Sequence, residues 1–276
     1  VSANDDNGVA YMKFSNDGIT WSSPASYTTA TTSWVLAADD GPKTVYARFQ
    51  DAAGLWSGPT TTIFDTITLD MSAPTGTISG FQGLTALSTI PTVTVNLICD
   101  DTVSGCSQMR FSNNGTTWST PVTYATTTNW MLDSISDGSK TVYAQFKDTA
   151  GNWSSSVITK SITLDSAAPT GSVVIDTYAA VATSQTATLT LTCSDATSGC
   201  SEMQFKNESG SWSAPVTFAT ATTWSLVSTD GTTTVHFGPA AYSLSVKGVN
   251  DAGNSAVSVG DEIFYSGDLN RAGSYA

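Results

Sequence analysis

Aspartate is the residue type whose number and placement in this sequence could do chemistry. Of the 23 acidic residues, only Glu202, Glu208 and Glu262 are glutamates. Carboxylate oxygens suit calcium in irregular loops, but aspartate also commonly caps turns without any ion. Seven aspartates stand where they could hold calcium at junctions between repeated segments: Asp70, Asp100, Asp101, Asp148, Asp165, Asp195 and Asp251. Calcium binding and ordinary turn capping are two hypotheses for them, and both stay open.

The four cysteines form two pairs with identical spacing. Six residues separate Cys99 from Cys106, and six separate Cys193 from Cys200. A zinc centre needs more ligands than two cysteines, and the chain has a single histidine to add. We therefore predict two disulfides, each closing a short loop and adding roughly 2–3 kcal/mol to stability. Disulfides in turn predict an oxidising, extracellular location.

Catalytic patterns are weak in this sequence. A Ser-His-Asp arrangement has only His236 to draw on, and abundant aspartate is not by itself a glycosidase signature. No glycine-rich phosphate-binding motif precedes a helical pattern. We therefore predict that the segment is not an enzyme and that it has no cofactor apart from the hypothetical calcium.

The eight tryptophans allow two interpretations. Exposed, coplanar rings would form a carbohydrate-binding platform, whereas rings that pack in the core or against loops would be structural. Most of them recur at fixed positions beside alternating strand residues, as Trp21, Trp118 and Trp212 do. We favour packing for these residues.

The residues described so far must be positioned by strands, because the sequence alternates and shows no helical period. Short β-rich runs are separated by turn signals such as Asn-Asn-Gly and Asp-Gly. In the middle of the chain we predict seven strands: 75–79, 92–99, 108–111, 118–124, 129–132, 140–147 and 157–164. This pattern predicts an all-β fold of antiparallel, two-sheet sandwiches of the immunoglobulin type.

Similar sequence segments recur along the chain. Met12, Met109 and Met203 head matching segments, 97 and then 94 residues apart. A period near 95 residues is about one sandwich domain, so we predict three domains in a row. The predicted segments are 1–70, which lacks its opening strand, 71–165, 166–265 with altered late strands, and a polar tail, 266–276.

Sandwich topology predicts where the aspartates meet. Successive strands alternate in direction, so the loops after the second and sixth strands lie at the end where the chain enters. In the middle repeat these loops carry Asp100, Asp101 and Asp148, and the incoming linker carries Asp70. Asp165, Asp195 and Asp251 are the corresponding set at the next junction. Converging carboxylates would repel one another unless a cation neutralised them.

Composition excludes some partners. The formal net charge is −13, with ten lysines and arginines in 276 residues. With so few basic residues, the sequence predicts no basic patch for phosphate backbones or anionic lipids. Nucleic acid is therefore not an expected partner. No apolar run reaches the roughly 18 residues that span a bilayer, so we expect no membrane insertion in this segment.

Two motifs carry a family resemblance. The turn Asp148-Thr-Ala-Gly-Asn-Trp-Ser154 and the linker Ile162-Thr-Leu-Asp-Ser-Ala-Ala-Pro-Thr170, with their earlier copies, resemble tandem bacterial immunoglobulin-like repeats. The stretch Tyr242–Asn254 of the third repeat is similar to the sixth strand of a fibronectin type III domain. The resemblance implies secreted or cell-surface proteins, including adhesins, without catalysis. It also implies junction calcium, with Asp70 and Asp165 as linker ligands and Asp148 and Asp251 as loop ligands.

The sequence thus predicts a non-catalytic extracellular segment of a bacterial surface or secreted protein, serving as a stalk, spacer or adhesive array. Its expected partners are neighbouring domains or subunits of a surface assembly, and a host or cell-surface ligand. Two alternatives stay open. The chain could be a subunit of an extracellular filament, in which a strand from one copy completes the sheet of another. It could also form accessory modules of a secreted enzyme.

Overall fold

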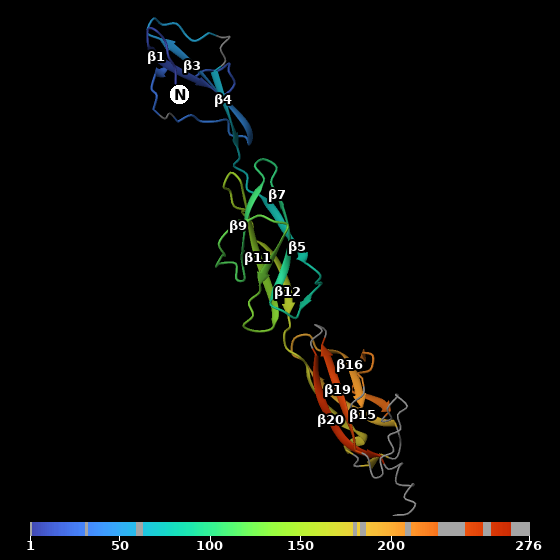
Figure 1. Cartoon of the computed structure of the whole chain (residues 1–276). Helices are drawn as coiled ribbons and strands as arrows, with labels where there is room; N and C mark the ends of the chain where they lie inside the picture. Colours follow the sequence, from blue (N-terminus) through green and yellow to red (C-terminus); the bar gives the residue numbers. More distant parts are fainter. Residues whose placement is uncertain are drawn as a thin grey trace, which may run out of the picture. The chain divides into compact units, whose positions relative to one another are not determined.

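The computed structural model describes residues 2–30, 33–58, 63–178, 181–182, 186–207, 211–225, 241–250 and 255–265. Over these ranges the chain is built from β-strands arranged in five sheets (Figure 1). The one helical element described is a three-residue 3₁₀ turn, Asp176–Tyr178. Among the described residues, no helix has both the length and the apolar character needed to cross a membrane. The predicted all-β fold is confirmed.

The chain divides into two compact units. The first comprises Val1–Ser79, Leu97–Thr126 and Tyr143–Thr159, and the second comprises Gly80–Asn96, Thr127–Val142 and Lys160–Ala276. Each repeat junction lies within one unit, the linker after residue 69 in the first and the linker after residue 164 in the second. The domain boundaries predicted from the repeat remain a prediction.

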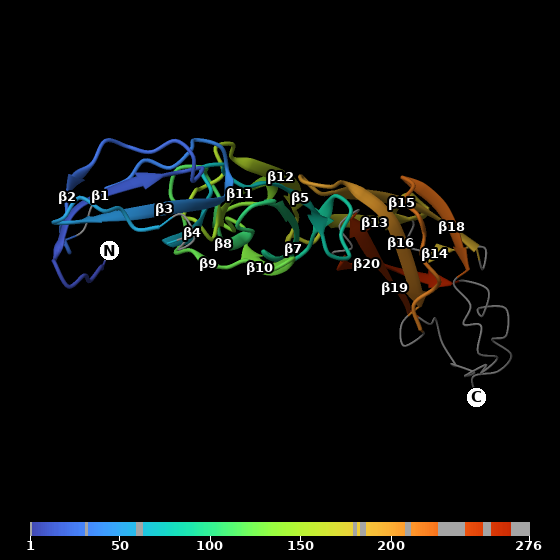
Figure 2. The ribbon, with the colours of Figure 1, turned by 90° about the horizontal axis from the view of Figure 1, so that it is seen from above.

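The first sheet has the order β2-β1-β3-β4 and is antiparallel. Its strands are β1 (Val9–Ser15), β2 (Ala25–Ser26), β3 (Gly41–Asp51) and β4 (Ile63–Leu69). β1 and β3 lie side by side (Figure 2), pairing Met12 with Phe49 and Phe14 with Ala47. These four side chains are buried on one face because side chains alternate along a strand.

The middle repeat forms two sheets, β10-β7-β5 and β6-β12-β11-β8-β9. The strands are β5 (Thr75–Phe81), β6 (Leu87–Ser88), β7 (Thr92–Asp100), β8 (Cys106–Ser112), β9 (Val122–Thr123), β10 (Thr127–Met131), β11 (Gly138–Asp148) and β12 (Ile158–Leu164). In β11, Val142, Ala144 and Phe146 are fully buried at every second position. This alternation is the pattern of a strand with one face in the core of a sandwich.

The third repeat has the matching pair of sheets, β13-β15-β18 and β14-β20-β19-β16-β17. The strands are β13 (Thr170–Ile175), β14 (Val181–Ala182), β15 (Thr186–Ser194), β16 (Cys200–Asn207), β17 (Val216–Thr217), β18 (Ala221–Ser225), β19 (Ala241–Asn250) and β20 (Ser255–Tyr265). Ala187, Leu189 and Leu191 of β15 are buried in its core. The altered late strands still form an antiparallel hairpin, β19 with β20. The polar tail, 266–276, lies outside the described residues.

Two details of the middle repeat differ from the strands predicted. The predicted strand 118–124 is reduced to β9, because Pro121 has no amide to donate and the Ser119 hydroxyl takes the Phe111 amide at 3.1 Å. The two-residue strand β6, which pairs in parallel with β12, was not predicted. A pair of residues is too short to show alternation.

The apolar face of the first sheet is open to solvent at its β4 side. Ile67 is 58% exposed, whereas Ile162, the matching residue of β12, is 3% exposed. Leu36 is only half-buried, whereas its counterpart Leu132 is 2% exposed. In the middle repeat this face is covered by the sheet that contains β5 and β7.

Gly76 in β5 is a position where the backbone needs glycine for space. A Cβ added there would lie 2.4 Å from the Ile98 carbonyl oxygen and 2.6 Å from the Phe146 ring. We expect Gly76→Ala to lower the free energy of unfolding by about 1–3 kcal/mol, the usual cost of overpacking. Gly80→Ala in the same strand meets nothing within 4 Å and is the matched control. Denaturant unfolding that ranks the two variants equally would contradict this assignment.

Candidate metal centre

Three of the predicted aspartates meet at one point in the first unit. One carboxylate oxygen each from Asp70, Asp101 and Asp148 lies within 4.8 Å of the others. The three residues come from the linker, the loop after β7 and the end of β11. The topological prediction is confirmed for these three, although they are 31 and 47 residues apart in sequence.

Asp101 is held by the loop that follows it. Its Oδ1 accepts hydrogen bonds from the amides of Val103, Ser104 and Gly105, at 3.2, 2.9 and 2.7 Å. Gly105 has a φ of +75°, a conformation that glycine adopts without strain and that turns its amide toward the carboxylate. Because Oδ1 is saturated by these amides, Oδ2 is the oxygen that Asp101 can offer to a cation.

Asp148 is 1% exposed and is held by the turn between β11 and β12. Its Oδ1 accepts the amides of Gly151 and Asn152 at 2.6 and 2.8 Å, and its Oδ2 accepts the Asn152 side-chain amide at 2.8 Å. The same Asn152 Nδ2 lies 3.1 Å from the Asp70 carbonyl oxygen and 3.3 Å from that of Ser72. Asn152 therefore ties the linker to the loop that carries Asp148.

Asp70 supplies the observation that fits the cluster to a cation. Its side chain is only 9% exposed, and its Oδ1 accepts the Ser72 amide at 3.1 Å. Its Oδ2 is buried and has no hydrogen-bond partner. Burying a carboxylate oxygen without a partner costs a few kcal/mol, so such an oxygen calls for a ligand.

The charges around the cluster are not balanced by the protein. Two full charges 4.8 Å apart repel by roughly 3 kcal/mol at an effective dielectric constant of 20. In the part of the chain that the structure describes, the ion pair of Lys43 Nζ with Asp39 Oδ2, at 2.9 Å, includes none of the three cluster aspartates. Three carboxylates with backbone carbonyls beside them form an all-oxygen donor set, which suits calcium. The residues present therefore fit the ion that the resemblance implies.

Asp100 does not join this cluster. It is exposed at the end of β7, and its carbonyl oxygen accepts the Thr75 hydroxyl at 3.4 Å. Asp100 and Asp101 are neighbours in an extended segment, so their side chains leave the backbone in different directions. The structure thus distinguishes two candidates that the sequence treated alike.

The second junction repeats part of this arrangement. Asp195 Oδ1 accepts the amides of Thr197, Ser198 and Gly199, at 3.1, 2.9 and 3.1 Å, as Asp101 does in its own loop. Asp165 is fully buried, and its Oδ2 accepts the Ser198 hydroxyl at 2.5 Å. Asp251, the third predicted ligand, lies outside the described residues, as does His236.

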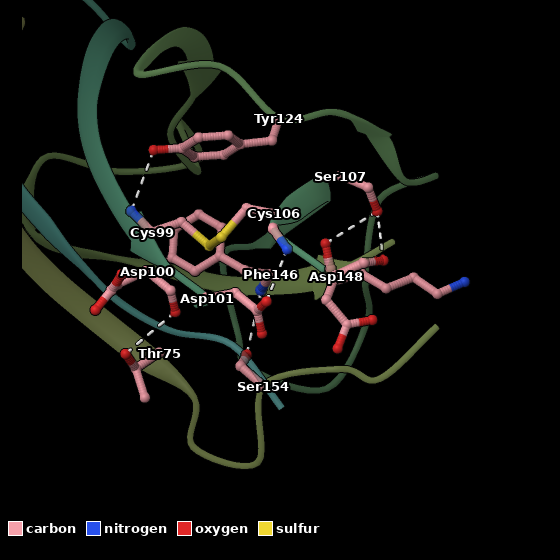
Figure 3. Close-up of a disulfide and its surroundings, with 12 residues drawn as sticks. Thr75, Cys99, Asp100, Asp101, Cys106, Ser107, Tyr124, Phe146, Asp148 and Ser154 are labelled. Atoms are coloured by element: carbon pink, nitrogen blue, oxygen red, sulfur yellow. Dashed lines mark hydrogen bonds between the residues drawn. A yellow bond between two sulfur atoms is a disulfide. The ribbon is translucent and has the colours of Figure 1, made fainter. Parts of the chain in front are cut away.

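Both predicted disulfides are present. Cys99 is joined to Cys106 and Cys193 to Cys200, with Cα–Cα distances of 6.4 and 6.3 Å. Figure 3 shows the first of them beside Asp101, with the Tyr124 hydroxyl accepting the Cys99 amide at 3.1 Å. The bond closes the loop that presents Asp101, so a covalent constraint supports the cluster.

The tryptophans at the strand surface are covered by cations. Arg110 Cζ lies 4.9 Å from the Trp118 ring centre and 4.3 Å from that of Trp153. Lys13 and Arg48 stack in the same way on Trp21 and Trp56 of the first repeat. These half-buried rings are packed against charged side chains, an arrangement that stabilises the sheet surface.

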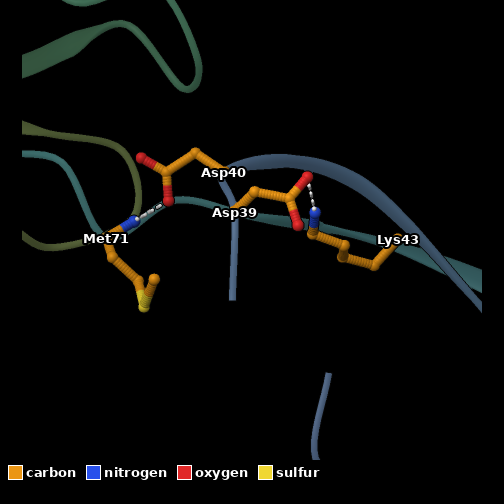
Figure 4. A network of polar contacts seen from close by, with 4 residues as sticks. All are labelled: Asp39, Asp40, Lys43 and Met71. Carbon is orange, nitrogen blue, oxygen red and sulfur yellow. Dashed lines mark hydrogen bonds and ion pairs between the residues drawn. The ribbon is translucent and has the colours of Figure 1, made fainter. Parts of the chain in front are cut away.

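Two aspartates that we did not single out from the sequence bind the linkers. Asp40 Oδ1 accepts the Met71 amide at 2.8 Å (Figure 4), and its Oδ2 accepts the Ser72 hydroxyl at 2.5 Å. Asp137 accepts the amides of Ser166 and Ala167, both at 3.0 Å, and the Ser166 hydroxyl at 2.8 Å. We call these two sets of contacts the linker clamps. The signal in the sequence was an aspartate before Gly41 and before Gly138, 97 residues apart.

The clamps lower the pKa values of their aspartates. The Ser72 hydroxyl, followed by the Met71 amide, lowers the pKa of Asp40 below its ordinary value of 3.8. Burial acts to raise the pKa of Asp137, but the hydrogen bonds from Ser166 and Ala167 outweigh it and the pKa is lowered. A lowered pKa in the folded state means that the ionised form is the one that the clamp holds.

These directions predict how the clamps depend on pH. Because the folded pKa lies below the unfolded one, the contribution to stability is complete above about pH 4 and is lost as pH falls through the folded pKa. An NMR titration of ¹³C-labelled aspartate carboxyls should therefore give midpoints below 3.8 for Asp40 and Asp137. Midpoints at or above 3.8 for both residues would show that the clamps do not form in solution.

Comparison with known proteins gives likenesses in structure only. No protein-family profile and no curated protein sequence matches the chain. A Ca²⁺-stabilized adhesin of an Antarctic bacterium that binds ice is 16% identical, with 96% of this chain and 67% of that one covered and a TM-score of 0.46. A 1.5-MDa bacterial ice-binding adhesin is 16% identical, with coverages of 95% and 88% and a TM-score of 0.44. Fibronectin(III)-like modules of Clostridium thermocellum CbhA are 14% identical, with coverages of 71% and 98% and a TM-score of 0.40.

These structures belong to the two classes of module that the sequence motifs resemble, adhesin repeats and fibronectin(III)-like modules. At such identities and TM-scores the likenesses carry no argument about function. The fold rests on the five sheets described above.

Proposed function

We propose that this chain is a non-catalytic segment of an extracellular surface or secreted protein, in which calcium at a repeat junction stiffens a stalk or adhesive array. The buried, unpartnered Oδ2 of Asp70 beside Asp101 and Asp148 is the observation that carries the proposal. The two disulfides support a location outside the reducing cytoplasm. A surface ligand and neighbouring domains of the same assembly are the partners proposed with it.

Asp70, Asp101 and Asp148 would hold the ion. They come from the linker and from two loops of the repeat that follows it, so a shared cation would join the linker to that repeat. Calcium would neutralise the repulsion among the carboxylates and give the Asp70 oxygen a partner. Because the ion binds the folded arrangement, binding adds to the stability of the native state.

Calorimetry and thermal unfolding of the whole chain in calcium, magnesium and chelator test this proposal. At a calcium concentration 100 times Kd, binding adds about 2.7 kcal/mol, and Tm should rise by several degrees over the value in chelator. Magnesium should stabilise less, because it needs a stricter octahedral geometry. An unchanged Tm with no heat of binding would refute calcium binding.

Asp101→Asn and Asp100→Asn form a matched pair for the same experiment. Asp101→Asn keeps an oxygen for the three loop amides but removes one charge from the cluster, so calcium affinity at this junction should fall at least tenfold. Asp100→Asn removes an equal charge from the neighbouring exposed residue and should leave affinity nearly unchanged. Equal losses in the two variants would show that only the overall negative charge attracts the ion.

A second candidate function is supported by the open face of the first sheet. The exposed Ile63 and Ile67 lie on that face of β4, and a hollow of about 420 Å³ is lined by Phe49 and Ile63. The middle repeat covers the matching face with alternating apolar residues such as Val93, Val95 and Leu97. A filament subunit that accepts an apolar strand from another copy would use this face.

A polymerisation assay distinguishes a filament subunit from a stalk segment. If copies complete one another, the purified chain should form concentration-dependent oligomers in light scattering, and Ile67→Asp should abolish them without unfolding the middle repeat. Ile135→Asp, at a position 92% exposed outside the open face, is the control. A chain that remains monomeric at high concentration would exclude the filament subunit.

A further inference from the structure

The linker after β4 carries two opposite sets of contacts on three consecutive residues. Asp70 has a buried, unpartnered Oδ2 and lies in the cluster with Asp101 and Asp148, which belong to the repeat that follows. Met71 and Ser72 donate to Asp40, which lies in the turn before β3 of the repeat that precedes. The linker is therefore bound from both sides.

Ser72 joins these two sets directly. Its hydroxyl donates to Asp40 at 2.5 Å, and its carbonyl oxygen accepts from Asn152 Nδ2 at 3.3 Å. Asn152 in turn donates to Asp148 Oδ2 at 2.8 Å. An unbroken series of hydrogen bonds thus runs from the β3 turn through the linker to a carboxylate of the cluster.

The second linker shows that the clamp is a repeated feature of the chain. At both linkers the aspartate accepts the amide of the residue that follows the linker aspartate, Met71 in one and Ser166 in the other. The serine has moved by one position between the two linkers, yet its hydroxyl reaches the equivalent aspartate in each. The same chemistry kept at a shifted position argues against a chance contact.

We infer that Asp40 and Asp137 are joint residues, which lock each linker onto the preceding repeat and so transmit the order of the cluster across the junction. Without the clamp, an ion at Asp70, Asp101 and Asp148 would fix the linker only to the repeat that follows. With it, the same ion limits the motion of both neighbours. The transmission of calcium binding rests on the proposed function, whereas the clamp itself does not.

Distance distributions across the first junction test the inference on the whole chain. Spin labels on noncanonical residues at Ile19 and Thr116, both exposed, avoid the disulfide cysteines. Asp40→Ala should at least double the width of the distribution, in calcium and in chelator alike. Ser72→Ala, which removes only the hydroxyl, should broaden it less. Asp6→Ala, an exposed aspartate of the same repeat, should leave the width unchanged.

Calcium titration distinguishes the role of the Asp40 clamp from the binding of calcium at the cluster. In the unaltered chain calcium should narrow the distribution. In Asp40→Ala, calcium should bind with a Kd within about threefold of the original but should no longer narrow it. Full narrowing in Asp40→Ala, or no broadening of that variant in chelator, would overturn the role of Asp40. Absence of calcium binding in the unaltered chain would refute the proposed function, while the chelator comparison would still decide the clamp.

Discussion

The structure depends on how negative charge is compensated at the points where one repeat passes into the next. Asp70, Asp148 and Asp165 are almost fully buried, in a chain that has 23 acidic and only ten basic residues. Backbone amides and hydroxyls compensate most of these carboxylates. The Asp70 Oδ2 has no hydrogen-bond partner, and Asp70 lies beside two further carboxylates. A buried carboxylate without a counter-charge is costly enough to determine what else must be present.

The sandwiches themselves are built from an ordinary hydrophobic pattern. Every second residue of β7 and β11 is buried, and glycine is needed where β5 passes close to Ile98 and Phe146. Hydrophobic burial of this kind stabilises each repeat but places no constraint on its neighbour. The polar contacts of the linker, through Ser72 and Asn152 above all, supply that constraint.

Much of this could be predicted from sequence, because the signals are local or repeated. The cysteine spacing gave the two disulfides, and alternation gave most strands of the middle repeat. The convergence of Asp70, Asp101 and Asp148 followed from strand direction alone. Strand direction could not show which of the neighbours Asp100 and Asp101 joins the cluster, because the direction of each side chain depends on where β7 ends. Asp40 and Asp137 were not predicted, since their partners lie about 30 residues away and depend on the path of the linker.

The disulfide between Cys99 and Cys106 has a consequence for the order of events during maturation. It encloses Asp101 in a loop whose backbone is already restricted, so part of the entropy of ordering that loop, roughly 2–3 kcal/mol in the chain-entropy model, is lost before any ion arrives. Oxidation of the two cysteines therefore preorganises the loop that carries Asp101. In the first repeat the corresponding positions are Ser2 and Val9, with Asn4 in place of Asp101. The disulfide and the loop aspartate are thus present together in the second and third repeats and absent together in the first. This is expected if the disulfide positions the aspartate.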